Sequence, residues 1–358
     1  MPTPTLCGSH GAIPPSSKPG PNMTAIATTT FKARRNALGK IGSLAMFGAG
    51  ASLLAAPAIV RAVGDKTTFK YPLNPSFDLI YLAEDLGYFE GTTTRPEYIG
   101  RVSSPQIIPL TSIGEIDFGS RMVPLVISAV AAGGDIKVVA AGGKTLQEAP
   151  HMKYFVRKDS GISKPKDLEG KTIGFNSFGA CAEFVTKTWM RQNGVDVNKV
   201  NFVVIPDDNA EQTLVTGNTD LAIIHAPFSG RADKSPQLTR LWSDYDLDGG
   251  LGGMSPYSAH GKFIKEHPQA VRDVVTAIAK AGNWVNANPE EARKLISKRT
   301  NLKLEFVDRY AYVEDLVVTE PPIQYYIDVL EREGKLQKGK VTTKDIYTNE
   351  FNPNAKAV

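Results

Sequence analysis

From Thr67 onward the chain alternates short apolar runs with longer amphipathic stretches. The short runs are rich in Val, Ile, Phe and Thr and predict buried strands, whereas stretches with apolar residues every three or four positions predict helices. This alternation is typical of a mostly parallel sheet covered by helices. In the first series, the expected strands are 67–71, 94–99, 116–119 and 136–142, and the expected helices are 77–87, 103–114 and 121–132.

A second series of the same kind follows turn signals at 143–150. Its expected strands are 152–157, 171–176, 200–205, 219–224 and 239–242, and its expected helices are 165–169, 180–193 and 208–216. The segment 243–253 is acidic and glycine-rich, which is typical of a hinge or an exposed crossing. The remainder is expected to be largely helical, at about 262–283, 289–298, 303–311 and 320–333.

Two such series joined by two crossings predict an α/β protein with two lobes, each a mostly parallel sheet flanked by helices. We assign 63–145 and 254–358 to lobe I and 146–253 to lobe II. A small ligand is expected between the lobes, because clefts at such interfaces are where small molecules usually bind.

Residues 1–62 have the layout of an export signal. Lys and Arg residues precede a charge-free stretch from Ile41 to Val60, and Arg34-Arg35 begins a run similar to the twin-arginine motif. We expect export of the folded protein to the periplasm and cleavage after Ala62. An uncleaved membrane anchor is the alternative, and Met23 is an alternative start to Met1.

Composition and charge exclude several classes of protein. The chain is 42% hydrophobic and 22% charged, as ordinary globular proteins are. Of the 41 Lys and Arg residues, six lie in 1–62, which leaves 35 against 37 Asp and Glu and gives no support for a nucleic-acid partner. Only two cysteines occur, one of them in the leader, so neither an internal disulfide nor a cysteine-rich metal site is expected.

The usual sequence motifs of catalysis are missing. The five histidines include no pair at i, i+4 and no His-x-His, and neither a Gly-x-Ser-x-Gly elbow nor a phosphate loop occurs. We therefore expect a protein that is not an enzyme, with no catalytic residue, no metal and no cofactor. A catalytic triad assembled in space would leave no such motif, so this alternative stays open.

Three predicted strand ends carry small polar residues before a helix, where unpaired backbone N–H groups and the helix dipole favour an anion. Arg121 follows one of them, and a guanidinium beside a buried strand end needs a carboxylate or a ligand anion. Ser76 can equally cap its own helix. His225, Phe228 and Tyr257 are further candidates. The alternative for His225 is a ring that is satisfied by a backbone carbonyl, and the alternative for Phe228 is a place in the core. The expected ligand-binding residues are Asn74, Ser76, Phe77, Ser120, Arg121, Asn176, Ser177, Gly179, Ala180, Cys181, His225, Phe228 and Tyr257.

Several stretches are similar to motifs of the solute-binding proteins of nitrate/sulfonate/taurine-type ABC importers. They are LIYLAEDLGYFE at 79–90, GEIDFG at 114–119, VRKDSGI at 156–162, DLEGKTIG at 167–174 and FIKEHP at 263–268. The resemblance covers about 67–335 and implies a two-lobed periplasmic-binding-protein (venus-flytrap) fold. It also implies capture of a small organic anion, such as a sulfonate, taurine, nitrate or a carboxylate, and delivery to an ABC permease and its ATPase. We expect a monomer.

The chain departs from this family at one turn of the expected site. Relatives tend to carry Gly-Ser-Thr where this chain has Gly179-Ala180-Cys181, so hydroxyl groups that would reach a sulfonate are missing. Cys181 is expected as a small buried residue, with a reactive thiolate as the alternative. Two other functions stay open. One is a ligand sensor without transport, and the other is a same-fold enzyme related to thiamine-pyrimidine synthesis, a group that carries a cysteine-rich motif and a lysine for pyridoxal phosphate.

Overall fold

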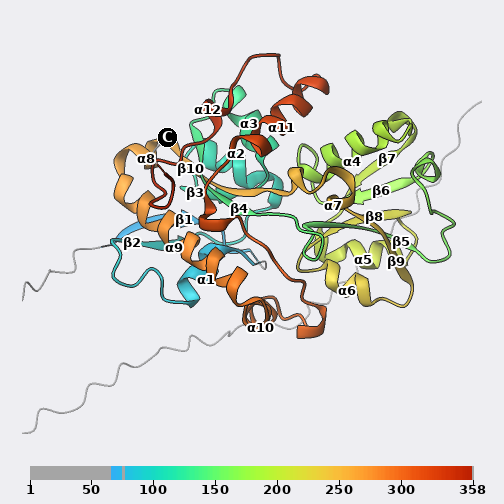
Figure 1. Cartoon of the computed structure of the whole chain (residues 1–358), viewed down its shortest axis with the longest axis horizontal. Coiled ribbons are helices and arrows are strands. Elements are labelled where there is room, and N and C mark those ends of the chain that lie inside the picture. Colours follow the sequence, from blue (N-terminus) through green and yellow to red (C-terminus); the bar gives the residue numbers. More distant parts are fainter. Residues whose placement is uncertain (1–65, 75–76, 357–358) are drawn as a thin grey trace, which may run out of the picture. The chain divides into compact units, whose positions relative to one another are not determined.

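The first four strands and the last strand of the described chain form two adjoining sheets in a computed structural model, which describes residues 66–74 and 77–356 (Figure 1). In the first sheet, β1 (Thr67–Tyr71) pairs in parallel with β2 (Thr94–Tyr98). In the second, β10 (Ser255–His260) lies between β3 (Phe118–Ser120) and β4 (Ile136–Gly143) and is antiparallel to both. The expected leader and Ser76 lie outside the described residues.

A five-stranded sheet is built from the middle of the chain, in the order β7-β6-β8-β5-β9. β6 runs parallel to β7 and β8, whereas β5 is antiparallel to β8 and β9, so this sheet is mixed. All five residues of β8 are buried, because it is a central strand with both faces covered. The strands are β5 (Met152–Arg157), β6 (Thr172–Phe175), β7 (Asn201–Val204), β8 (Leu221–His225) and β9 (Leu238–Ser243).

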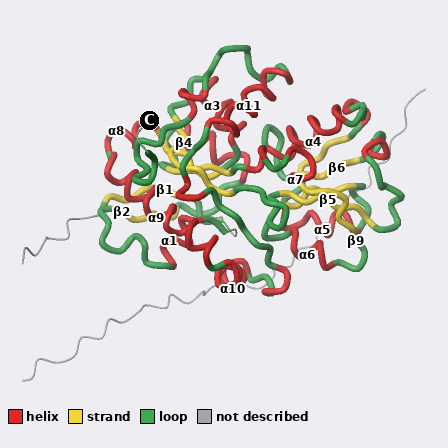
Figure 2. Tube along the Cα trace, viewed as in Figure 1, coloured by secondary structure: helices red, strands yellow, loops and turns green. Residues whose placement is uncertain are grey.

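Helices cover these sheets from both sides (Figure 2). Beside the first two sheets are α1 (Leu79–Asp85), α2 (Ile107–Ser112), α3 (Val123–Ala131), α8 (Gly261–Glu266) and α9 (Pro268–Ala287). Beside the five-stranded sheet are α4 (Cys181–Gln192), α5 (Asp207–Val215), α6 (Ser229–Lys234) and α7 (Asp244–Asp248). The remaining helices are α10 (Pro289–Thr300), α11 (Glu320–Arg332) and α12 (Thr343–Ile346). Among all the residues that the structure describes, no helix is long and apolar enough to cross a bilayer.

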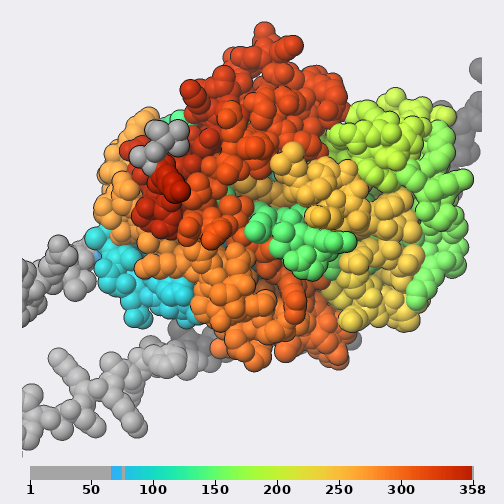
Figure 3. All heavy atoms as spheres, in the orientation of Figure 1, coloured from blue at the N-terminus to red at the C-terminus, as the bar shows by residue number. Residues whose placement is uncertain are grey.

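The C-terminal part of the chain packs against the five-stranded half of the molecule. The Tyr326 hydroxyl of α11 donates to the carbonyl of Gly252 at 2.5 Å, and Arg332 Nη2 donates to Thr188 Oγ1 of α4 at 2.8 Å. In Figure 3 the orange-red atoms of this region lie directly against the green and yellow ones. Helix α11 therefore ties the two groups of sheets together.

A buried lysine makes a second contact between the five-stranded sheet and the C-terminal part of the chain. Lys153 Nζ of β5 donates to Asp233 Oδ2 and Asp308 Oδ1, both at 2.6 Å, and its side chain is only 6% exposed. Asp308 comes from the segment after α10, and its other oxygen accepts from Ser229 Oγ at 2.5 Å. Each of these groups is expensive to bury unless the others are present.

The second crossing between the lobes differs from the sequence expectation. The segment 243–253 is expected to be a hinge or an exposed crossing rather than a core element, but it contains α7 and a 3-10 turn, Leu251–Gly253, and Asp244 is fully buried. Asp244 Oδ1 accepts from the Met152 N–H at 3.2 Å, and its other oxygen accepts from Thr145 Oγ1. The two crossings at 143–150 and 243–253 thus meet at a buried carboxylate.

Burial raises the pKa of Asp244 to about 6, although the hydrogen bond from Thr145 opposes this. Because this folded pKa lies above the ordinary value, the contribution of Asp244 to stability is full below about pH 4 and is lost as the pH rises through about 6. We expect the wild type to lose up to about 2 kcal/mol relative to Asp244→Asn between pH 4 and pH 8. Urea unfolding at both pH values measures this difference. Equal changes in the stability of the wild type and of Asp244→Asn over this range would contradict the prediction.

Two further elements differ from the pattern. The expected helix at 303–311 is wrong, since only the single turn Leu304–Phe306 is helical. The pattern does not predict β10, because Ser-Pro-Tyr-Ser-Ala-His is neither alternating nor continuously apolar. It is a strand because β3 and β4 flank it on both edges, which is tertiary context rather than local preference.

Candidate functional site

Polar side chains meet where β6 and β8 end. His225 is the last residue of β8, Asn176 follows β6, and Asp207 begins α5. Asp207 Oδ1 accepts from His225 Nδ1 at 2.8 Å and from the His225 backbone N–H at 3.1 Å, while Oδ2 accepts from Asn176 Nδ2 at 2.8 Å. The carboxylate therefore fixes the imidazole and turns its Nε2 away from Asp207.

That Nε2 faces the thiol of Cys181, the first residue of α4, at 3.8 Å. His151, which directly precedes β5, directs its own Nε2 to the same sulfur at 4.0 Å. The two imidazole rings lie edge to face, with centroids 4.9 Å apart. We call His151, Cys181 and His225, with Asp207 and Asn176 behind them, the Cys181 cluster.

The two histidines of the cluster carry different charges. Burial, together with the charge of the nearby His225, lowers the pKa of His151 to about 3, so this ring is neutral. Burial also opposes a charge on His225, but the Asp207 carboxylate outweighs it and raises the pKa of His225 to about 10. The same pairing holds the pKa of Asp207 below its usual value despite burial.

Arg121 lies at the end of β3 and has no acidic partner within ion-pair distance among the described residues. Its Nη1 donates to the Ser120 carbonyl at 3.0 Å and its Nη2 to Ser104 Oγ at 2.9 Å, both neutral acceptors. Its Nε is buried and has no hydrogen-bond partner in the described part of the chain. A buried guanidinium donor without an acceptor is costly, and an anionic ligand would satisfy it.

The positive charge of Arg121 affects the pKa of titratable groups in both halves of the molecule. Burial raises the pKa of Asp78, the residue that caps α1, and the charge of Arg121 opposes this rise. The same charge contributes to the low pKa of His151. Arg121 therefore lies within electrostatic range of α1 on one side and of the Cys181 cluster on the other.

The turn before α4 already holds an internal carboxylate. The N–H of Gly179 donates to Glu183 Oε2 at 2.6 Å, and Glu183 is buried and paired with Lys187. This backbone donor, expected to face a ligand, is thus occupied. Ala180 caps α4 without a side-chain acceptor, and Ser177 Oγ donates to the Phe178 carbonyl at 3.0 Å.

Gly179 also marks a close approach between the two halves. Its φ is +75°, and a Cβ at this position would lie 3.4 Å from Leu125 Cδ2 of α3. That distance is an ordinary van der Waals contact, so the left-handed backbone is what favours glycine here.

The remaining expected residues serve the fold in this structure. The Tyr257 hydroxyl accepts from the Leu79 N–H of α1 at 2.8 Å, and Tyr257 pairs in register with Ser120. Phe77 is buried edge-on against Tyr310, with ring centroids 5.2 Å apart.

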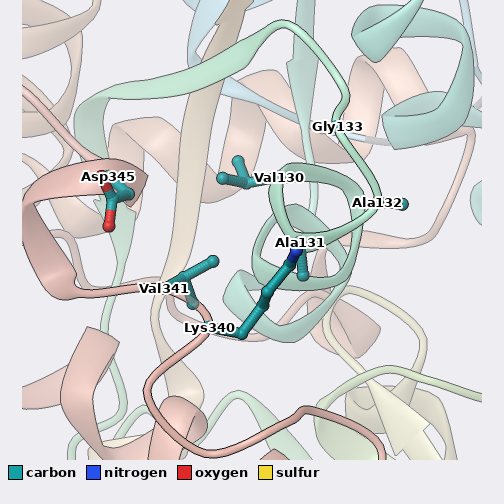
Figure 4. A pocket seen from close by; sticks show the side chains of 7 residues that line it. All are labelled: Val130, Ala131, Ala132, Gly133, Lys340, Val341 and Asp345. Carbon is teal, nitrogen blue, oxygen red and sulfur yellow. The ribbon is translucent and has the colours of Figure 1, made fainter.

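Asn74 and Phe228, two more of the expected ligand-binding residues, lie outside the Cys181 cluster. Asn74 Oδ1 accepts from the Val102 N–H at 3.0 Å, and Phe228 packs on the core between the five-stranded sheet and α5 and α6, with Leu214 and Ala232. A pocket at the end of α3 is lined by none of the expected residues (Figure 4). The structure thus unites Asn176, Cys181 and His225.

Sequence reasoning missed two members of the cluster. Asp207 follows the expected strand 200–205 in the same way as Asn176 follows its strand, so the strand-end rule could have found it. His151 precedes a strand, and no spacing links it to Cys181 30 residues later. Only the fold shows that its ring belongs to the cluster.

Comparison with known proteins places these features in a family. Residues 74–292 match the family model described as NMT1/THI5 like. A 4-amino-5-hydroxymethyl-2-methylpyrimidine phosphate synthase of Candida albicans (strain WO-1) is 23% identical over 234 residues, which cover 60% of this chain and 64% of that protein. The chain therefore spans a little less than two thirds of the length of this relative.

Solved structures agree in fold. The periplasmic aliphatic sulphonate binding protein SsuA from Escherichia coli is 19% identical with a TM-score of 0.64, over 82% of this chain and 95% of that chain. The periplasmic nitrate-binding protein NrtA from Synechocystis PCC 6803 is 13% identical with a TM-score of 0.66, over 80% and 87%. The expected periplasmic-binding-protein fold is thereby confirmed. Since the family model matches more than half of its residues, this chain belongs to the NMT1/THI5-like family.

Proposed function

We propose that the protein is the solute-binding component of an ABC importer and captures a small organic anion between lobe I (63–145 and 254–358) and lobe II (146–253). The observation that carries this proposal is Arg121, a guanidinium with a buried free Nε and no acidic partner in the described residues. The fold shared with sulphonate-binding and nitrate-binding proteins supports a binding role.

In this proposal the anion contacts Arg121 first and then groups from the other lobe. Cationic His225 supplies positive potential there, whereas the turn before α4 is already occupied by the Glu183 carboxylate. Closure about 143–150 and 243–253 adds these second contacts, and a ligand favours the closed state only through such additional contacts. The closed form then docks on the permease and its ATPase.

A thermal-shift screen of the full chain tests this function. The panel comprises sulfonates, carboxylates, nitrate, bicarbonate, pyrimidines and amines. A ligand present at a hundred times its Kd adds about 2.7 kcal/mol, which raises the Tm by several degrees. Stabilisation by one class of anion supports the proposal, whereas stabilisation by amines or by neutral pyrimidines alone contradicts it. If nothing binds, mass spectrometry of the denatured protein's extract shows whether an anion was carried through purification.

The curated relatives suggest a second candidate, synthesis of a pyrimidine phosphate. The resemblance to that enzyme group implies a cysteine-rich motif, but the chain has only two cysteines, Cys7 and Cys181. We therefore favour binding over catalysis. Formation of a Schiff base on adding pyridoxal phosphate would favour the enzyme instead.

Export to the periplasm gives a separate prediction. Replacing both Arg34 and Arg35 with Lys should leave unprocessed precursor in the cytoplasm, because the twin-arginine pathway reads that pair. Immunoblots of cytoplasmic and periplasmic fractions measure the outcome. Replacing Lys40 with Arg in the same segment is the control and should leave processing unchanged. Normal processing of the double variant would indicate the general secretory route.

A further inference from the structure

Three side chains that commonly bind metals converge in the Cys181 cluster. The nitrogens of His151 and His225 and the sulfur of Cys181 all lie within 4.8 Å of one another. They come from the segment before β5, the start of α4 and the end of β8, so three separate parts of the sheet edge hold them in place. All three side chains are mostly withdrawn from solvent.

The distances are close to those of a tetrahedral zinc site. Zn–S and Zn–N bonds of about 2.3 and 2.0–2.1 Å place sulfur and nitrogen roughly 3.6 Å apart in a tetrahedron. In the structure, Cys181 Sγ is 3.8 Å from His225 Nε2 and 4.0 Å from His151 Nε2. These two distances need to shorten by only a few tenths of an ångström. The two histidine nitrogens lie within 4.8 Å of each other, against about 3.4 Å in a tetrahedron, so the imidazole rings move toward each other when the ion binds.

The groups behind the cluster match the outer shell of such sites. Metal-bound histidines usually donate their second N–H to a carboxylate, which fixes the tautomer and the ring orientation. His225 Nδ1 makes this contact with Asp207 at 2.8 Å, and Asn176 holds the second carboxylate oxygen. The lone pair of His225 Nε2 is available to a metal once the imidazole has lost its second proton, which metal binding promotes.

A reactive pair of one thiol and one imidazole is the alternative to a metal site, but it would leave the position of the second histidine unexplained. Such a pair needs one histidine beside the cysteine, and His225 with Asp207 supplies it. His151 is a second imidazole, and its Nε2 is directed at the same sulfur. Two imidazoles and one thiol around a common point form a set of ligands that suits zinc.

We propose that His151 Nε2, Cys181 Sγ and His225 Nε2 bind one Zn²⁺ ion, with Asp207 as the outer partner of His225. Three protein ligands leave a fourth position open to water or to an anion. This inference goes beyond solute capture and does not depend on it, because the metal can be titrated without any solute. When Zn²⁺ is bound, its charge replaces the charge of protonated His225 at this end of the five-stranded sheet.

Zinc titration of the full chain tests the proposal. The protein carries Cys7→Ser, so that Cys181 is the only thiol, and has no histidine tag. Competition with a chromophoric chelator should give one Zn²⁺ per chain. Cys181→Ser and His151→Gln should each weaken binding by about 100-fold or more, and Asp207→Asn by about 10–100-fold. His267→Gln, at an exposed position on another part of the fold, is the matched control and should bind as the parent does.

Cobalt supplies a readout that depends on the sulfur itself. Co²⁺ in the parent should give intense tetrahedral d–d bands and a thiolate-to-cobalt charge-transfer band, and the latter should vanish in Cys181→Ser. Circular dichroism and thermal melting show whether each variant is folded, and His151→Gln replaces Cys181→Ser if the latter is not. Absence of stoichiometric Zn²⁺ binding, or unchanged affinity in a folded ligand variant, would overturn the proposal.

Discussion

Arg121→Ala should weaken binding of the anionic solute about tenfold or more while leaving the protein folded. Within 66–74 and 77–356, the guanidinium has a buried Nε without a partner and donates otherwise only to a carbonyl and a hydroxyl. A charge-assisted hydrogen bond contributes roughly 1.5–3 kcal/mol, and the loss of one accounts for the expected change. Calorimetric titration with the anion identified in the screen measures it.

Two further variants sharpen this experiment. Arg121→Lys keeps the charge but loses the planar set of donors, so its affinity should fall between those of the wild type and Arg121→Ala. Arg101→Ala removes an exposed arginine after β2 and should bind as the wild type does. Equal affinity of Arg121→Ala and the wild type would remove Arg121 from the site.

Lys153→Met should destabilise the protein by about 3–5 kcal/mol. The Nζ of Lys153 lies 2.6 Å from carboxylate oxygens of both Asp233 and Asp308, and the side chains of Lys153 and Asp308 are only 6% and 10% exposed. Removing the ammonium leaves two carboxylates facing each other, one of them buried. Because Asp308 belongs to the segment after α10, the link between that segment and β5 is lost as well.

Urea unfolding at neutral pH measures this loss. Lys294→Met is the matched control, because Lys294 pairs with Glu291 on the surface and both side chains are more than half exposed. That variant should stay within about 0.5 kcal/mol of the wild type. A Lys153→Met protein as stable as the control would show that the buried pair contributes little.

Strands could be predicted from the sequence where a run of apolar residues is bounded by turn residues. β1 and β5 have the expected bounds because their apolar runs end at clear turn signals. β10 could not be predicted, since its place between β3 and β4 depends on a return of the chain from the other half. The burial of Asp244 depends in the same way on Thr145, which lies 99 residues away.

The residues of the candidate site also could be predicted only in part. Cys181 and His225 could be named because each lies where a predicted strand ends. The ring of His151 joins them only through the packing of β5 beside β8, and Glu183 takes the Gly179 N–H because the first turn of α4 folds back on it. Local pattern thus locates the edge of the sheet, and tertiary contacts decide which side chains meet there.

A crystal structure of the protein with the anion found in the screen tests the central claim most directly. The account predicts one anion between the lobes, within hydrogen-bond distance of Arg121 Nε and contacting at least one group from the five-stranded half. An anion bound elsewhere, or one held by a single lobe with Arg121 turned to solvent, would contradict it.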